Sequence, residues 1–99
     1  RNLFVVGDLV LDPVAHQVTL AGNVLDIIGR EYDLLHALML NAGRVLSRAQ
    51  IEQHLYDWGY EVASNAIEVH IHHLRRKLPP GTIETVRGVG YVVHKEPGT

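Results

Sequence analysis

The stretch from Asn65 to Leu78, NAIEVHIHHLRRKL, most constrains the fold, because it combines a helical pattern with an abrupt end. At 100° per residue, the side chains of its aliphatic stripe lie within about 40° of Ile67. They are Ile67, Ile71, Leu74 and Leu78. The Pro79-Pro80-Gly81 sequence that follows cannot continue a helix. We therefore predict an amphipathic helix over residues 64–78 that packs its aliphatic stripe against a core.

The segment before this helix changes from strand patterns to helix patterns. Residues 3–27 contain four short β-rich runs, which are interrupted at Gly7-Asp8 and around Ala21-Gly22-Asn23. Residues 29–43 have apolar side chains at three- and four-residue steps and then a stop signal. Ser47 and Gln50 match the S-x-x-Q capping box that begins a helix. These patterns predict four antiparallel strands followed by two helices.

The segment after residue 81 predicts a hairpin, because two β-rich runs flank Arg87-Gly88-Val89-Gly90. The whole order is typical of an α+β fold, a winged helix-turn-helix preceded by a four-stranded sheet. We expect one domain over residues 1–99. It would comprise an N-terminal sheet at about 3–27, a three-helix unit at 29–78 and a wing hairpin at 82–94.

The distribution of charge tells more about function than the net charge of −2. Residues 1–62 hold four Arg and eight acidic residues, a formal charge of −4. Residues 63–99 hold five Lys or Arg and three Glu, a formal charge of +2, and four of the seven histidines. The basic groups therefore gather on the third helix and the hairpin, which indicates an acidic partner.

The helix side opposite the aliphatic stripe combines an amide, a valine, imidazoles and a guanidinium. These side chains are Asn65, Val69, His72, His73 and Arg76, with Arg75 on the flank. Such a mixture suits a DNA major groove, where apolar groups meet thymine methyls and Asn or Arg meets base edges. A basic but merely solvated helix face is the alternative. Arg87 at the hairpin tip favours the interpretation that the helix binds in a DNA groove, because it adds a second basic element next to the first.

Other functions have weaker support in the sequence. The three histidines of HIHH suggest zinc, but on a helix His72 points about 160° away from His70, and the i, i+4 pair of metalloproteases is absent. We expect no metal, no cofactor and no membrane span. No nucleophile–base arrangement indicates an enzyme.

Three segments together resemble the C-terminal effector domain of OmpR/PhoB-type bacterial response regulators. They are SRAQIEQHLY, NAIEVHIHHLRRKL and IETVRGVGY. The amino-acid sequence around residues 56–75 is most similar to the QseB and PmrA branch of that family. The resemblance implies a winged helix that binds double-stranded promoter DNA and regulates transcription in a two-component system. Helix 64–78 would enter the major groove, and Arg87 the adjacent minor groove.

The resemblance also implies roles for individual positions. Asn65, Val69, His72, His73 and Arg75 match contact positions of the recognition helix. Phosphate-contact positions match Arg48, Tyr56, Ser64 and Thr85. Loop 57–63 matches a segment that touches RNA polymerase in some relatives.

Two positions depart from the family pattern. Ile28 stands where relatives place a Thr or Ser cap, which should cost about 1 kcal/mol of helix stability. His72 and His73 stand where relatives often carry Arg, and an imidazole has a shorter reach and only a fractional charge near neutral pH.

The resemblance also bears on partners outside this chain. The family carries a phosphorylated receiver domain, which this sequence lacks, and two copies would bind direct repeats in promoter DNA. We expect a cytoplasmic protein. The alternative function is a protein-interaction module that uses the same basic helix on an acidic partner such as RNA polymerase.

Overall fold

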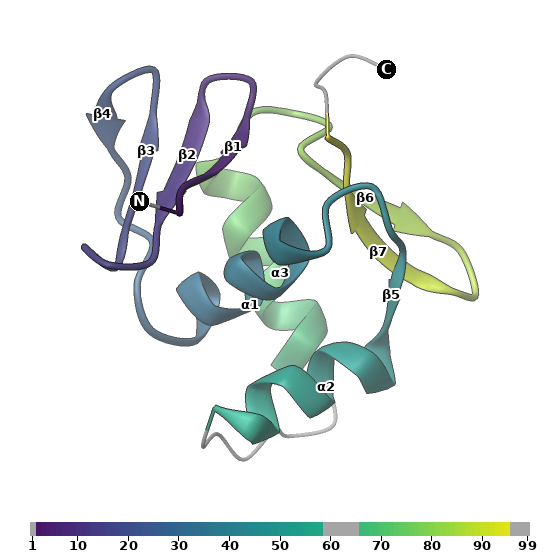
Figure 1. Cartoon of the computed structure of the whole chain (residues 1–99). Coiled ribbons are helices and arrows are strands. Elements are labelled where there is room, and N and C mark those ends of the chain that lie inside the picture. Colours follow the sequence, from purple (N-terminus) through teal and green to yellow (C-terminus); the bar gives the residue numbers. More distant parts are fainter. Residues whose placement is uncertain (1, 59–65, 96–99) are drawn as a thin grey trace.

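The N-terminal part of the chain forms an antiparallel sheet in which the strands follow one another in sequence order. The computed structural model describes residues 2–58 and 66–95 (Figure 1). The strands are β1 (Phe4–Val6), β2 (Leu9–Asp12), β3 (Gln17–Leu20) and β4 (Asn23–Val24). Their inward side chains are buried: Val6, Leu9, Leu11 and Val18. The predicted four-stranded sheet is therefore confirmed.

The turn between β3 and β4 forms where the sequence predicted it. Ala21 and Gly22 have φ angles of 50° and 84°, and Leu20 pairs with Asn23. Two successive positive φ angles are typical of the tight hairpin turn whose twist matches that of the flanking strands. Gly22 has open space around it, so its backbone conformation is the reason for a glycine there.

Helix α1 (Gly29–Leu40) begins without a side-chain cap. Ile28 occupies the cap position with extended φ and ψ, and its side chain makes no cap hydrogen bond. The expected departure from the family pattern is thus confirmed. The helix is instead stabilised by burial, because its inward residues contact both the sheet and the other helices. They are Tyr32, Asp33, Leu34, Leu35, Ala37, Leu38 and Met39.

Helix α2 (Arg48–Asp57) begins with the predicted capping box. Ser47 Oγ accepts a hydrogen bond from the Gln50 backbone N–H at 3.1 Å. The Ser47 N–H in turn donates to Gln50 Oε1 at 2.8 Å. The side-chain oxygen of each residue thereby accepts a hydrogen bond from the backbone N–H of the other, as the sequence pattern indicated.

The C-terminal hairpin is part of a three-stranded sheet, which the sequence did not predict. Strands β6 (Ile83–Val86) and β7 (Gly90–Val93) form the hairpin, and β5 (Leu46–Ser47) pairs with β7. At Gly90 an added Cβ would lie 1.9 Å from the carbonyl oxygen of Leu46. Only glycine therefore permits the backbone of β5 to approach β7 so closely.

Helix α3 (Ala66–Lys77) lies behind α1, and the segment that follows it leads across to β6 of the hairpin (Figure 1). The helices lie between the N-terminal sheet and the three-stranded sheet, and one apolar core joins all of them. The strands, the three helices and the hairpin have the order predicted for a winged helix. This arrangement places α3 and the tip of the β6–β7 hairpin at the surface.

Candidate nucleic-acid interface

Helix α3 has one buried and one exposed side, as its angular pattern predicted. Ile67, Ile71 and Leu74 are at most 1% exposed and pack against α1 and α2. Val69 is 42% exposed, and the other outward side chains are exposed as well: His72, His73 and Arg76. An exposed valine surrounded by donors is an unusual combination for a solvated helix face. We call these four residues the outer face of α3.

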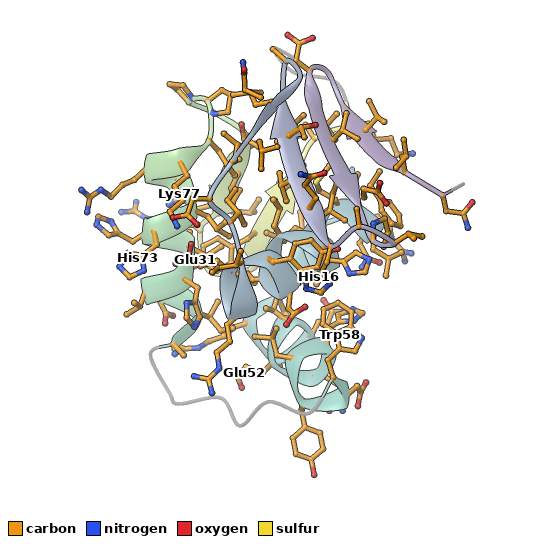
Figure 2. The ribbon with its side chains drawn as sticks, turned by 90° about the vertical axis from the view of Figure 1, so that its left-hand side faces the viewer. His16, Glu31, Glu52, Trp58, His73 and Lys77 are labelled. Atoms are coloured by element: carbon orange, nitrogen blue, oxygen red, sulfur yellow. The ribbon has the colours of Figure 1, made fainter. Side chains whose placement is uncertain are left out.

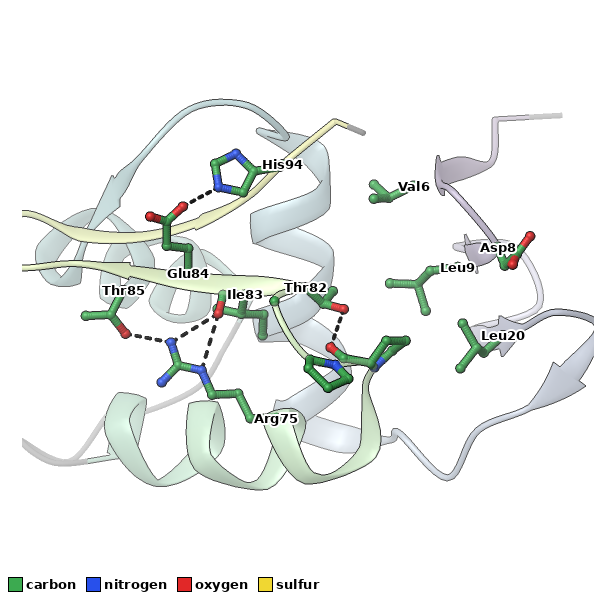
Figure 3. A pocket seen from close by; sticks show the side chains of 13 residues that line it. Val6, Asp8, Leu9, Leu20, Arg75, Thr82, Ile83, Glu84, Thr85 and His94 are labelled. Carbon is green, nitrogen blue, oxygen red and sulfur yellow. Dashed lines mark hydrogen bonds and ion pairs between the residues drawn. The ribbon is translucent and has the colours of Figure 1, made fainter. Parts of the chain in front are cut away.

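Arg75 joins α3 to the hairpin (Figure 3). Its Nε and Nη2 donate to the carbonyl oxygen of Ile83 at 3.3 and 3.1 Å, and Nη2 also donates to Thr85 Oγ1 at 2.6 Å. One planar guanidinium thereby holds two points of β6. The orientation of the hairpin relative to α3 is fixed by this contact, so the two surface elements form one unit.

Arg48 joins the start of α2 to the first turn of α3. Its guanidinium lies 2.9 Å from Glu68 Oε1 and 3.3 Å from Glu52 Oε1. The hydrogen bond to Glu68 is the main reason that the pKa of Arg48 is raised. This guanidinium is therefore already engaged with two carboxylates, although both pairs are exposed and each contributes little to stability.

Arg76 and Arg87 have no such partner. Within residues 2–58 and 66–95, no carboxylate lies within ion-pair distance of either guanidinium. Arg87 is exposed at the hairpin tip, next to Gly88 with a φ of 74°. The positive charge on this side of the described surface is thus concentrated in two places, the outer face of α3 and the hairpin tip, which Arg75 holds in a fixed relation.

Known proteins resemble this chain in both sequence and fold. The family described as "Transcriptional regulatory protein, C terminal" matches residues 22–93. Over 85 residues the chain is 60% identical to the response regulator protein PmrA of Pseudomonas aeruginosa, and this match covers 86% of the chain and 38% of PmrA. The chain belongs to this family. It is an effector domain of the OmpR/PhoB response-regulator type, a transcription-regulator domain and not an enzyme.

Further relatives support the same family and fold. The transcriptional regulatory protein QseB of Escherichia coli O157:H7 is 54% identical over 87 residues, which cover 88% of this chain and 40% of QseB. The chain therefore spans about two fifths of the length of these curated relatives. The RstA DNA-binding domain of Klebsiella pneumoniae, solved in complex with the RstA box, has a TM-score of 0.84 and 30% identity, with 96% of this chain and 99% of that chain covered. The DNA-binding domain of CpxR from E. coli has a TM-score of 0.81 and 33% identity, with 95% and 97% covered.

The effector domain engages several of the predicted site residues in internal contacts. Arg75 and Thr85 contact each other, and Arg48 pairs with Glu52 and Glu68. Val69, His72, Arg76 and Arg87 are exposed on α3 and the hairpin tip, and Tyr56 is 69% exposed on α2. Ser64, Asn65 and residues 59–63 of the predicted loop 57–63 lie outside the described residues. The structure thus separates candidates whose side chains make no hydrogen bond or ion pair within the described residues from those that join elements of the site.

His73 is held toward α1 (Figure 2). Its Nδ1 lies 3.4 Å from Glu31 Oε2, and Lys77 Nζ donates to Glu31 Oε1 at 2.8 Å and to the carbonyl oxygen of Asp26 at 2.7 Å. Glu31 belongs to the first turn of α1, and sequence reasoning assigned it no role. No local pattern could have found this contact, because it depends on how two helices distant in the sequence pack together.

A groove of about 720 Å³ separates the base of the hairpin from the N-terminal sheet (Figure 3). Its walls include Leu9 and Leu20 of the sheet, and Ile83 of β6. Glu84 and His94, which are hydrogen-bonded to each other, line it as well.

No helix in the described part of the chain is long and apolar enough to cross a membrane.

Proposed function

We propose that this effector domain binds double-stranded promoter DNA sequence-specifically as part of a response regulator. The observation that carries the proposal is the pair of guanidinium groups without a carboxylate partner among the described residues, Arg76 on the outer face of α3 and Arg87 at the hairpin tip. Arg75 joins the two elements that carry them. A guanidinium without a carboxylate partner can contact a phosphate or base without first breaking an ion pair. The RstA domain, which has the same fold, was solved in complex with the RstA box.

Helix α3 would lie in the major groove. Val69 would meet a thymine methyl, and Arg76 and His72 would reach base edges or the adjacent phosphates. Arg87 would enter the neighbouring minor groove, where an arginine is attracted by the negative potential. Arg75 would act mainly by fixing the hairpin, because its donors already contact Ile83 and Thr85.

Most of the remaining predicted positions would contact the sugar–phosphate backbone. We assign Tyr56 and Thr85 to phosphates, together with Ser64, and we assign Asn65 to bases. Arg48 could also reach a phosphate, but it would have to leave Glu52 and Glu68. Its contribution to affinity should therefore be smaller than that of Arg76.

The larger assembly is also a proposal. Two copies would bind direct repeats about one helical turn apart, in a cytoplasmic regulator whose receiver domain is not part of this chain. Loop 57–63 would be the contact for RNA polymerase.

Selection from a pool of random duplexes tests the function. We expect enrichment of a repeated motif by the wild-type chain, and loss of enrichment in Arg76→Ala and Arg87→Ala. Lys95→Gln, which removes one positive charge near the end of β7, is the matched control and should keep the motif. Retention of duplexes without any enriched sequence would instead favour the alternative, a basic helix that binds an acidic protein.

A further inference from the structure

Two helices bring together three side chains that carry metal-binding donor atoms. Glu31 comes from the first turn of α1, and His70 and His73 lie one turn apart on α3. One ligand atom from each lies within 4.8 Å of the other two. The sequence suggested that the three histidines of HIHH form a poor metal site, because His72 points away from His70. In the structure Glu31 of α1 supplies the third donor instead.

The distances suit a small ion. His73 Nδ1 and Glu31 Oε2 are 3.4 Å apart, which is close to the roughly 3.3 Å between two ligands of a tetrahedral ion with bonds of about 2.0–2.1 Å. Lys77 holds the other carboxylate oxygen, Oε1, at 2.8 Å. Glu31 can therefore present Oε2 to an ion while Lys77 keeps the carboxylate oriented (Figure 2).

His70 is the second observation that points to a ligand. Its Nδ1 is buried and has no hydrogen-bond partner among the described residues. A buried ring nitrogen without a partner is costly, so a polar interaction at this imidazole is missing. Burial also lowers the pKa of His70, with Arg30 and His73 acting in the same direction and Glu31 opposing them. The neutral imidazole, which is the form that binds metals, is thereby favoured.

We propose that Glu31, His70 and His73 form a binding site for Zn²⁺, with the fourth position open to water. Two imidazoles and one carboxylate are the donors that zinc accepts, whereas Ca²⁺ and Mg²⁺ require mainly oxygen. The nearby Lys77 ammonium repels a dication and weakens its binding. We therefore expect zinc to bind reversibly and with moderate affinity. The ion would fasten α3 to the start of α1, which lacks a side-chain cap.

Calorimetric titration of the tag-free chain with ZnCl₂ at pH 7.5 tests the site. We expect one equivalent to bind, with affinity at least about tenfold weaker in Glu31→Gln, His70→Gln and His73→Gln. His72→Gln is the matched control, since it removes the adjacent imidazole that points away, and its affinity should be unchanged. Titration with Co²⁺ should give the intense visible absorption of a four-coordinate ion, which His73→Gln abolishes.

Thermal unfolding gives a second measure, because a ligand that binds only the folded state raises the Tm. Zinc should raise the Tm of the wild type and of His72→Gln but not that of Glu31→Gln or His73→Gln. Absence of zinc binding, or equal affinities in His72→Gln and His73→Gln, would overturn the proposal. If His70→Gln does not fold by circular dichroism, the other two variants still decide. All measurements are made without DNA, so they are independent of the proposed function.

Discussion

The domain contains two groups of histidines that differ in what their rings contact. The first, which we call the ring group, gathers His16, His36 and His54 around Tyr32 and Trp58. His16 stacks on Tyr32 with ring centroids 3.8 Å apart, and His36 stacks on Trp58 at 5.2 Å with an interplanar angle of 20°. His54 contacts Trp58 from α2 at 5.9 Å. These imidazoles therefore pack against other aromatic rings from the β2–β3 turn, α1 and the end of α2.

The second group, on α3, packs little against other rings. His72 and His73 are exposed and tilted relative to each other at 5.9 Å, and His73 faces the carboxylate of Glu31. The same side chain thus contributes to internal packing in one region and is available to a ligand in the other. The sequence alone could indicate only the α3 group, because its histidines lie next to one another in the chain. The comparison predicts that substitutions in the ring group change stability, whereas substitutions on α3 and the hairpin change binding.

The largest effect is expected at Tyr32, the most deeply buried member of the ring group at 1% exposed. Tyr32→Ala should lower the free energy of unfolding by about 3–5 kcal/mol, because an aromatic side chain leaves a cavity in the core. Urea unfolding measures this loss. Affinity for the selected duplex, expressed per folded molecule, should not change.

Tyr32→Phe is the control for that experiment. The hydroxyl oxygen of Tyr32 is buried without a hydrogen-bond partner in the described structure, so removing it should be neutral or slightly stabilising. Burial, with Asp33 and Asp12, also raises the pKa of this hydroxyl. If Tyr32→Phe were as unstable as Tyr32→Ala, the hydroxyl would have an important partner and the ring packing would matter less.

Arg87 should show the opposite behaviour. Arg87→Ala should weaken duplex binding by about 1–3 kcal/mol, the usual scale for a specific arginine–base contact. Its Tm should stay unchanged, because the exposed tip contributes nothing to the core. Binding titrations and thermal unfolding of the same samples check both statements, with Lys95→Gln as the charge-matched control. A mutant that melts early but keeps its affinity per folded molecule would place Arg87 inside the fold instead of the groove.

A smaller effect should distinguish Arg76 from Arg48. Each released phosphate contact changes the slope of log affinity against log salt by about 0.9. Arg76→Ala should therefore reduce the slope by about 0.9, whereas Arg48→Ala should leave it nearly unchanged because Glu52 and Glu68 already hold that guanidinium. Binding titrations at several salt concentrations measure both slopes. Equal reductions would show that DNA displaces the two carboxylates.

The sequence predicted the features that depend on neighbouring residues. The Ser47–Gln50 capping box, the tight turn at Ala21-Gly22 and the two sides of α3 are each determined within a few residues. The missing cap at Ile28 belongs to the same class. Local hydrogen bonding and periodicity are sufficient for such features, and so the order of elements and the position of α3 could be obtained without a structure.

The contacts between distant segments could not be predicted in this way. Strand β5 has only two residues, and its one sequence signal, Gly90, lies more than 40 residues away. The bonds from Arg75 to Thr85 and from His73 to Glu31 depend on how the helices and hairpin pack. Arg75 was accordingly placed on the flank of α3 from the helix angle alone, and only the structure shows that its side chain bends back to β6.

The smallest effect concerns the titration of His36 in the ring group. Burial lowers the pKa of His36, and the neighbouring His16 and His54 act in the same direction, while Asp33 opposes them. The unfolded chain, with a histidine pKa of about 6.5, therefore binds more protons than the folded protein between the two pKa values. Stability must fall as the pH drops through about 6.5 and must level off below the pKa of the folded state. His70 contributes with the same sign.

Urea unfolding between pH 7.5 and pH 5, with a chelator present, should show a weaker pH dependence of the free energy of unfolding in His36→Gln than in the wild type. If His36→Gln kept the full pH dependence of the wild type, the burial of His36 would not be the cause of that dependence.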